Sequence, residues 1–357
     1  MTVIDGLARA GDERHAVLVA RATSADRYDS ADVIEYAAGP YLDRHGRTKD
    51  ALLSRAGAGK PGIIASYGDV AHAIPDGDHV LLAHNAPFCG GRFLPGMELL
   101  YAHNLIVPHH NWIAARRAVA GYSGIIAVSD WLANATQHAL GPRSRTPIHV
   151  VRNGVDTSTF TVPDRPEHDR VRVLFFGRVV PAKGPDLLLS ALSRLGRDDI
   201  ETHIVGSSGF SPYGPLTRYE RALRQIVPAV PGPVTFQPFV DRRAIVPVLQ
   251  EADIIVLPSR WLEPLGLVVL EAMAVGATVI VAETGGMLEA GGDAVLSFKR
   301  GSRRALADVL DAVVGDRALR QRLGAAARAR AERFDWALQA KALDRVLGTV
   351  QATPAPA

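Results

Sequence analysis

Residues 259–276, SRWLEPLGLVVLEAMAVG, contain two carboxylates, Glu263 and Glu271, on either side of a Pro-Leu-Gly-Leu turn that opens an apolar helix. Glu271 would occupy the second turn of that helix, among Leu, Val, Ala and Met side chains. A charge on a core-facing helix is costly unless a partner compensates it. Ribose hydroxyls are one such partner and a buried Arg or Lys is the other. Glu271 by itself therefore fits either a sugar-nucleotide site or a structural ion pair.

The rest of the chain alternates short apolar runs with helix-length patterns. Apolar runs without polar alternation are typical of strands buried on both faces, and they occur at 16–20, 80–83, 125–128, 171–176, 202–205, 253–257 and 278–282. Helical patterns occupy 185–195, 216–227 and 304–314. This alternation predicts an α/β protein with doubly wound parallel sheets.

Length and a polar break predict two domains. A chain of 357 residues is too long for one ordinary core. The stretch 161–170, TVPDRPEHDR, contains two prolines and separates two series of strands and helices. We therefore expect one Rossmann-like domain over 1–162 and a second beginning at 170. Because ligands of doubly wound sheets bind beyond the carboxyl ends of the strands, the two domains are expected to face each other across a cleft.

Composition narrows the classes of partner. The 40 basic and 37 acidic residues give a net charge of +3, without a long run of either sign, which argues against a nucleic-acid-binding protein. The single Cys89 excludes an internal disulfide, and the N-terminus shows no secretory pattern, so we expect a cytoplasmic protein. No window is suited to span a membrane. Residues 112–122 could form a basic amphipathic helix for peripheral membrane contact, or more simply a domain helix with one solvated face.

Two loops are suited to hold an anion. The strand 171–176 leads into Arg178 and Lys183, which flank the start of the next helix. Cations are unfavourable at a helix N-terminus, whereas an anion held between the helix dipole and the cations is stabilised by both. A diphosphate is the natural candidate, and two solvated surface cations are the alternative. A second helix start suited to an anion follows Gly266. Because this residue has no side chain, backbone N–H groups there can approach an anion closely.

Three segments together resemble the retaining glycosyltransferases of family 4, which have the GT-B fold: GRVVPAKGPDLLLSAL (177–192), the whole stretch 252–286, and VRNGVDTSTF (151–160). The similarity extends from about residue 125 to 336, with the motifs in the family's order. It implies transfer of a sugar from a nucleotide-diphosphate sugar to an acceptor hydroxyl with retention of configuration. It also implies that the reaction needs neither a metal ion nor another cofactor. Neither the sugar, the base nor the acceptor can be named from it.

The resemblance assigns roles to individual residues. It places Arg178 and Lys183 on the donor diphosphate, Glu263 on the donor sugar and Glu271 on the ribose hydroxyls. Leu265, Gly266 and Leu267 match a segment whose backbone contacts the donor, although the family commonly has Phe at the first of these. Glu263 is expected to bind sugar hydroxyls and is not assigned as a nucleophile.

Histidines supply one further candidate. His84 ends an apolar run and resembles the family histidine that lies toward the donor sugar, and Asn85 follows it on the same loop. A lone histidine at a strand end is otherwise a structural residue more often than a functional one. His103, His109 and His110 suggest a metal cluster only superficially, because no carboxylate or cysteine accompanies them at a recognised spacing. We therefore expect no metal site.

The C-terminal end of the chain follows the family pattern, whereas the N-terminal end departs from it. Residues 319–351, with FDW at 334–336, are similar to the final helices that cross back onto the first domain, so the second domain is expected to end at 318. At the other end, residues 2–10 already have a helical pattern and Gly11 caps it, so the family's first strand and its glycine-rich loop are expected to be missing. The natural start lies upstream of Met1, or the domain is trimmed and catalytically compromised.

A second departure from the family lies near the nucleotide base. Pro238 stands where the family usually has a glycine, so the identity of the base is not carried over from the resemblance.

Two rival functions remain open from the sequence. One is a phosphorylase or synthase of the same architecture, with phosphate or a sugar phosphate as acceptor. The other is a catalytically silent subunit that binds a nucleotide sugar or a partner enzyme.

Overall fold

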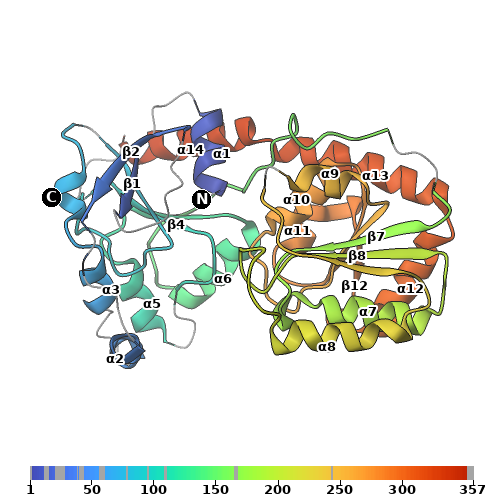
Figure 1. Ribbon diagram of the computed structural model, residues 1–357. Helices are drawn as coiled ribbons and strands as arrows, with labels where there is room; N and C mark the ends of the chain where they lie inside the picture. The colour runs from blue at the N-terminus through green and yellow to red at the C-terminus, as the bar shows by residue number, and fades with distance from the viewer. Residues whose placement is uncertain are drawn as a thin grey trace. The chain divides into compact units, whose positions relative to one another are not determined.

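The computed structural model describes residues 2–11, 16–20, 29–37, 39, 44–55, 61–77, 79–94, 96–107, 111–164, 168–242 and 244–351. The chain divides into two compact units. One consists of Met1–Asn153 together with Trp336–Ala357, and the other is Gly154–Asp335 (Figure 1).

The second unit is built on a six-stranded parallel sheet. Its strands are β7 (Val171–Phe176), β8 (Ile200–Val205), β9 (Val234–Gln237), β10 (Ile254–Leu257), β11 (Thr278–Ala282) and β12 (Leu296–Phe298). Their order is β12-β11-β10-β7-β8-β9, so the chain starts at the centre, builds one half outward and then returns to build the other. The direction of winding reverses between β7 and β10. Doubly wound sheets bind ligands at this switch point, beyond the carboxyl ends of the strands.

Helices cover both faces of this sheet (Figure 1). One face carries α7 (Pro185–Leu195), α8 (Arg218–Ile226) and α12 (Arg303–Val314), and the other carries α9 (Ile245–Gln250), α10 (Leu267–Ala274), α11 (Met287–Gly291) and α13 (Arg317–Ala331). The described residues of the unit also form four short 3₁₀ turns, η1 (Pro181–Lys183), η2 (Val227–Ala229), η3 (Gly292–Ala294) and η4 (Glu332–Phe334). Every residue of β10 and β11 is buried, which is why these strands are apolar runs without alternation.

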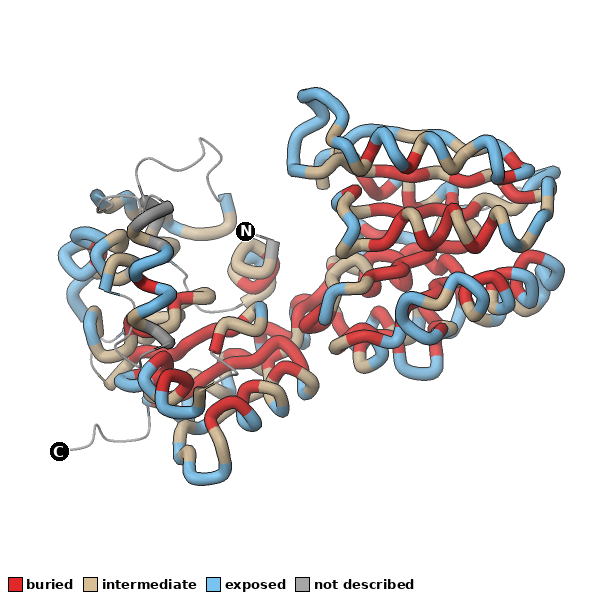
Figure 2. The backbone as a smooth tube through the Cα atoms, turned by 90° about the horizontal axis from the view of Figure 1, so that it is seen from below, coloured by how far each residue is buried: buried red, intermediate tan, exposed pale blue. Residues whose placement is uncertain are grey.

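One core lies between the sheet and the α7, α8 and α12 layer. Val173 and Phe175 of β7 pack there with Leu188 of α7 and Leu310 of α12. Figure 2 shows the buried residues along the strands, with exposed residues on the outer sides of the helices. This packing against the helices keeps the sheet rigid. The loops at its carboxyl edge therefore start from fixed positions.

The described residues of the first unit form two parallel sheets. One pairs β1 (Ala16–Ala20) with β2 (Asp32–Tyr36), and the other has the order β3 (Leu81–His84), β4 (Glu98–Ala102), β5 (Gly124–Ala127) and β6 (Ile148–Val150). Its helices are α1 (Thr2–Ala10), α2 (Arg44–Arg55), α3 (Pro61–Ser66), α4 (Val70–Ala73), α5 (Trp112–Val119), α6 (Asp130–Leu140) and α14 (Trp336–Gln351). A Cβ at Gly6 would lie 2.3 Å from the Trp336 indole, so the glycine lets α14 pack closely on α1.

Most expected elements are present, and the differences concern their bounds. The helix at 2–10, followed by the strand at 16–20, is confirmed, and Gly11 N–H donates to Leu7 O at 2.9 Å as a helix cap. The expectation of a missing strand and glycine loop concerns residues upstream of this helix and stays a prediction. The first unit ends at Asn153 rather than 162, and α13 belongs to the second unit, so the chain returns to the first unit at Trp336 and not at 319. The reason is that α13 packs against α10 and β11.

Arg328, on α13, cross-links three segments of the second unit. Its Nη1 donates to Phe160 O at 2.6 Å and to Ala274 O at 2.8 Å, and its Nη2 donates to Thr157 O at 3.0 Å. The end of α10 is thereby tied to the segment through which the chain enters the unit.

Candidate functional site

The loops that follow β7 and β10 are packed backbone against backbone at the switch point. Gly184 has φ +72, and a Cβ there would lie 2.2 Å from Pro258 O. Ala182 O accepts hydrogen bonds from Arg260 N at 2.7 Å and from Trp261 N at 3.1 Å. Only glycine fits the close approach at 184, because it has no side chain and tolerates a positive φ. The two loops therefore form one continuous wall.

Lys183 and Glu263 form an ion pair across these loops. Lys183 Nζ contacts Glu263 Oε1, and the Ser259 hydroxyl donates to the same oxygen at 2.8 Å. The two side chains are largely buried, with 24% of Lys183 and 10% of Glu263 exposed. The structure thus brings together two residues that the sequence assigned separately to the diphosphate and to the sugar.

Two glycines fix the backbone of Glu263. Gly285 has φ +57, and a Cβ there would lie 2.0 Å from Glu263 O. Gly286 N–H donates to Glu263 O at 2.6 Å. The position of the carboxylate is therefore set by main-chain contacts from the β11–α11 connection.

Helix α10 begins beside this carboxylate. Gly266 precedes its first residue with φ +86 and provides no side-chain cap, while Leu265 is fully buried and Leu267 is partly exposed. The first amides of a helix lack intrahelical acceptors and attract anions. The start of α10 is thus suited to hold the anion that the sequence predicts.

Glu271 lies one turn further along α10, and its side chain is 10% exposed. Burial raises its pKa above the usual value, and Arg242, whose Nη1 is 3.5 Å from Glu271 Oε1, opposes that rise. Arg242 follows β9, and 39% of its side chain is exposed. The structural ion pair that the sequence left open is therefore present in the structure. At 3.5 Å it is looser than a charge-assisted hydrogen bond, so the carboxylate retains capacity to accept.

Arg178 leaves the carboxyl end of β7 and stacks on an aromatic side chain. Its guanidinium lies 5.9 Å from the ring centroid of Phe210, which in turn contacts Phe239 edge-on at 6.2 Å. In the part of the chain that the structure describes, the Arg178 side chain makes no hydrogen bond or ion pair. Its charge is thus oriented by Phe210 without being neutralised.

A cluster of Arg260, Asp186 and Tyr219, which the sequence analysis did not identify, holds the two loops together. Arg260 donates two hydrogen bonds to Asp186, each at 2.8 Å, and the Tyr219 hydroxyl also donates to Asp186. Burial raises the pKa of Asp186, but these hydrogen bonds outweigh it and the net shift is downward. The cluster fixes the start of α7 to the loop after β10. An Asp in the first turn of one helix and an Arg just after a neighbouring strand were the available signals.

His84 lies in the first unit, at the carboxyl end of β3. Its Nδ1 is 2.7 Å from Nε2 of His103, which follows the neighbouring strand β4. Both rings pack on the buried Tyr101, with centroids at 5.0 Å and 4.7 Å. Burial, and secondly the neighbouring His103, lower the pKa of His84 to about 3, and burial lowers that of His103 to about 4. Both imidazoles are therefore neutral at physiological pH.

The remaining histidines and the amphipathic stretch add little to the site. His109 and His110 lie outside the described residues, and across the described ranges no three His, Cys, Asp or Glu side chains gather as metal ligands. Helix α5 buries Ala114, Ala115 and Ala118 and exposes Trp112, which fits a domain helix with one solvated face. No helix in the described part of the chain is long and apolar enough to cross a bilayer.

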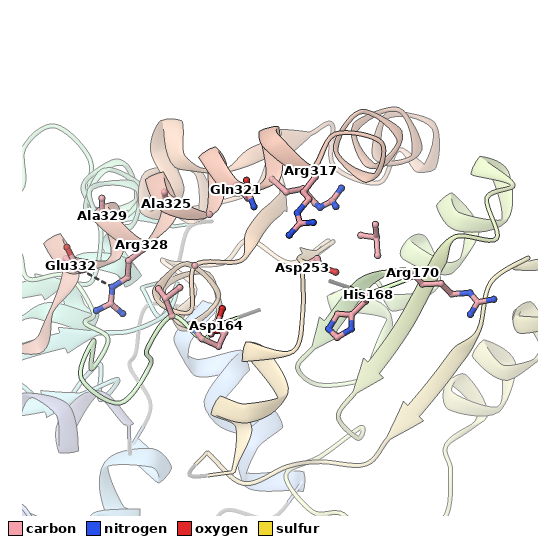
Figure 3. A pocket seen from close by; sticks show the side chains of 16 residues that line it. Asp164, His168, Arg170, Asp253, Arg317, Gln321, Ala325, Arg328, Ala329 and Glu332 are labelled. Carbon is pink, nitrogen blue, oxygen red and sulfur yellow. Dashed lines mark hydrogen bonds and ion pairs between the residues drawn. The ribbon is translucent and has the colours of Figure 1, made fainter. Parts of the chain in front are cut away.

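A cavity of about 790 Å³ lies elsewhere in the second unit, beside α13 (Figure 3). It borders Val171, Asp253 and Gly276, which lie at the amino ends of strands and thus at the sheet edge opposite Lys183. Its arginines already have protein partners: Arg320 donates to Val313 O and Val314 O, and Figure 3 shows Arg328 paired with Glu332. It is therefore not the site that the sequence predicts.

Comparison with known proteins finds a family match that covers most of the second unit. Residues 159–330 match the family described as glycosyl transferases group 1. The chain is 32% identical over 253 residues to a D-inositol 3-phosphate glycosyltransferase of Jonesia denitrificans, covering 64% of this chain and 57% of that protein. It is 29% identical over 232 residues to spore coat protein SA of Bacillus subtilis, covering 59% and 61%. The chain thus spans little more than half the length of the curated relatives it matches.

Solved structures extend the likeness over nearly the whole chain. A sucrose-phosphate synthase from Thermosynechococcus elongatus aligns with a TM-score of 0.73 at 19% identity, covering 94% of this chain and 89% of that one. The Anabaena protein HepE in complex with UDP aligns with a TM-score of 0.62 at 20% identity, covering 90% and 87%. At such identities the likeness establishes the fold alone. Residues 159–330 therefore match the glycosyl transferases group 1, and the chain has the GT-B fold of two Rossmann-like units.

Proposed function

We propose that this protein is a glycosyltransferase that moves a sugar from a nucleotide-diphosphate sugar to an acceptor hydroxyl with retention of configuration. The observation that carries the proposal is the arrangement at the switch point of the second sheet, where Lys183, Glu263 and the start of α10 adjoin. Charge for an anion, a carboxylate for hydroxyls and a helix start occur together at the position where doubly wound sheets bind nucleotides.

The donor diphosphate would bind Lys183, Arg178 and the amides at Gly266. The anomeric bond breaks as negative charge develops on the diphosphate, so fixed cations and a helix start lower the barrier. Lys183 carries three N–H donors and can contact Glu263 and a phosphate oxygen at once. These groups supply the stabilisation that a divalent metal provides elsewhere, and we propose that the reaction proceeds without one.

Glu263 would bind hydroxyls of the donor sugar, and Glu271 would bind those of the ribose. When ionised, each carboxylate has two oxygens that act only as hydrogen-bond acceptors. Ser259 and Lys183 hold Glu263 in one orientation, and a ribose would compete with Arg242 for Glu271. Leu265 and Leu267 flank the glycine, so their backbone would frame the diphosphate. The roles of these residues, that of His84 toward the sugar, and retention itself rest on the resemblance to family 4.

The first experiment is a thermal-shift series with UDP, GDP, ADP and TDP, followed by sugars attached to the nucleotide that stabilises most. The nucleotide sugar that binds best is then offered to acceptors. Inositol phosphates come first, because the chain is similar to D-inositol 3-phosphate glycosyltransferases. The anomeric configuration of the product is read by NMR, and a parallel reaction contains EDTA.

We expect one nucleotide to bind, transfer to proceed in EDTA and the anomeric configuration to be retained. Transfer to free phosphate would identify a phosphorylase instead. Nucleotide binding without transfer or donor hydrolysis, also in a chain extended upstream, would identify a silent subunit. Glu263→Gln is the matched variant: turnover at the wild-type rate would remove Glu263 from the site.

A further inference from the structure

The carboxyl edge of the first unit's four-stranded sheet holds a pair of histidines that the proposed reaction uses only in part. His84 ends β3 and His103 follows β4, and their facing nitrogens are 2.7 Å apart. Their rings are tilted by only 7°, with centroids 5.0 Å apart. The hydrogen bond therefore lies close to the plane of both rings, where an imidazole lone pair points.

The pair is held in place by backbone and by Tyr101. Asn85 has a positive φ of 52°, and its side-chain oxygen accepts a hydrogen bond from His103 N at 2.8 Å. Asn85 N donates to Tyr101 O at 2.9 Å, so the ends of β3 and β4 are tied together. Tyr101 is fully buried and contacts both imidazoles. Neither ring can turn without breaking these contacts.

The hydrogen bond requires one N–H and one lone pair, which allows two arrangements of the protons. The other nitrogen of His103, Nδ1, is buried and has no hydrogen-bond partner among the described residues. If His84 donated, His103 would carry its proton on Nδ1 and bury an N–H without an acceptor. If His103 donates, only a lone pair is left unused. Unpaired buried N–H groups are the rarer of the two in proteins.

We propose that His103 is a positioning residue that donates its Nε2–H to His84 and thereby holds His84 as the neutral tautomer protonated on Nε2. His84 is partly accessible, and Nε2 is its nitrogen without a partner in the described chain. His84 thus meets its ligand as a hydrogen-bond donor and not as a base. The group it recognises is an oxygen acceptor, such as a sugar hydroxyl or a phosphate oxygen.

The inference rests on the proposed function only for the identity of the ligand, since the tautomer is a property of the free protein. Long-range ¹H–¹⁵N NMR of histidine-labelled protein distinguishes a protonated ring nitrogen from a bare one. Loss of signals in His84→Gln assigns the resonances. We expect His84 to be protonated on Nε2 with a bare Nδ1 in the wild-type protein. A proton on His84 Nδ1 would overturn the proposal whatever the activity.

Two variants at His103 test its effect on turnover. His103→Phe keeps a planar ring but removes the donor, so His84 should exchange between tautomers and kcat should fall on the order of 10-fold. His103→Gln retains an N–H in reach of Nδ1 and should restore most of the turnover. Nucleotide affinity should stay the same in both. Equal kcat in all three proteins would refute a positioning role. If His103→Phe does not fold, the tautomer of the wild-type protein and the turnover of His103→Gln still test the proposal. A protein that shows the expected tautomer but binds no nucleotide sugar would contradict the proposed function alone.

Discussion

Lys183 and Glu263 lie 80 positions apart in the sequence and form an ion pair with each other. Each charge is therefore balanced by the other. A diphosphate would meet a lysine already fixed in position, and a sugar would meet a carboxylate already fixed by Lys183 and Ser259. This preorganisation reduces the ordering cost of binding.

Lys183→Gln should weaken nucleoside-diphosphate binding at least about 10-fold, because it removes a charge that the phosphate would contact. Glu263→Gln should leave that affinity within a few-fold and abolish sugar transfer. Isothermal titration with the best nucleotide gives the first value and a transfer assay gives the second. Lys299→Gln is the matched control, since Lys299 is exposed in the same unit. If Lys299→Gln weakened binding as strongly as Lys183→Gln, a specific role for Lys183 would be excluded.

Glu271→Gln should stabilise the ligand-free protein and weaken its binding of ribonucleotides. Burial raises the pKa of Glu271 in the folded state, so the folded chain holds this proton more tightly than the unfolded chain does. The contribution of Glu271 to stability is then full below the unfolded pKa and is lost as pH rises through the folded pKa. At pH 7 the variant should melt a few degrees higher, about 1 kcal/mol in a unit of this size. A dideoxyribose nucleotide should not distinguish the variant from the wild type; if it does, the carboxylate does not bind the ribose.

The stability of the first unit should fall as pH decreases below about 6.5. His84 and His103 have pKa values lowered to about 3 and about 4, so only the unfolded chain takes up their protons between neutral pH and those values. Stability is therefore full above the unfolded pKa and declines below it, by up to about 1.4 kcal/mol per pH unit for each histidine. Urea unfolding between pH 7 and pH 5 measures the slope. His103→Phe should have a shallower slope than the wild type, and an equal slope would contradict the assignment.

Phe210→Ala should reduce affinity for the nucleoside diphosphate by about two- to five-fold, the effect of losing one exposed cation–π contact. Arg178 then keeps its charge but loses the ring that orients it. Tyr213→Ala is the control, because Tyr213 is in the same connection and is 88% exposed. The nucleoside monophosphate should bind both variants alike. A larger loss in the Tyr213 variant would assign the effect to the loop as a whole.

Gly285→Ala should lower both stability and sugar transfer. Its Cβ would lie 2.0 Å from the backbone oxygen of Glu263, so the carboxylate would have to move. Gly301→Ala provides the comparison, since Gly301 also has a positive φ, +78, but has no atom within 4 Å of the added carbon. That variant should show only the strain of the backbone, about 1–2 kcal/mol. If transfer rates fell equally in both variants, the close contact of Gly285 with the Glu263 backbone would not be what positions the Glu263 carboxylate.

Much of the fold was predictable because buried parallel strands are apolar without interruption. The run at 171–176 matches β7 and that at 278–282 matches β11 residue for residue. Strand β4 was missed because it begins with Glu98 and contains Tyr101, which break the run. Glu98 is nevertheless fully buried, since its carboxylate accepts N–H groups from Gly91 and Phe93. The sequence alone does not show that the loop just before the strand folds back to supply those donors.

The sequence motifs nominate the residues of the candidate site but not the contacts between them. Family motifs assign Lys183 and Glu263 to different parts of a ligand, while their mutual contact depends on two loops meeting through Gly184. Arg242 was not identified as the partner of Glu271, because it follows an edge strand far from α10 in the sequence. His103 was considered only as a metal ligand. Its relation to His84 becomes visible once 98–102 is known to be a strand beside 81–84.

Three hydrogen bonds from Arg328 to backbone carbonyls cross-link the second unit in the way that a disulfide cross-links many exported proteins. They join α13 to Phe160, Thr157 and Ala274, which are 168, 171 and 54 positions away. The chain's single cysteine, Cys89, belongs to the first unit. No disulfide can therefore form or break within the second unit, whatever the redox conditions. The attachment of α10, the helix that carries Glu271, does not depend on the oxidation state of any thiol.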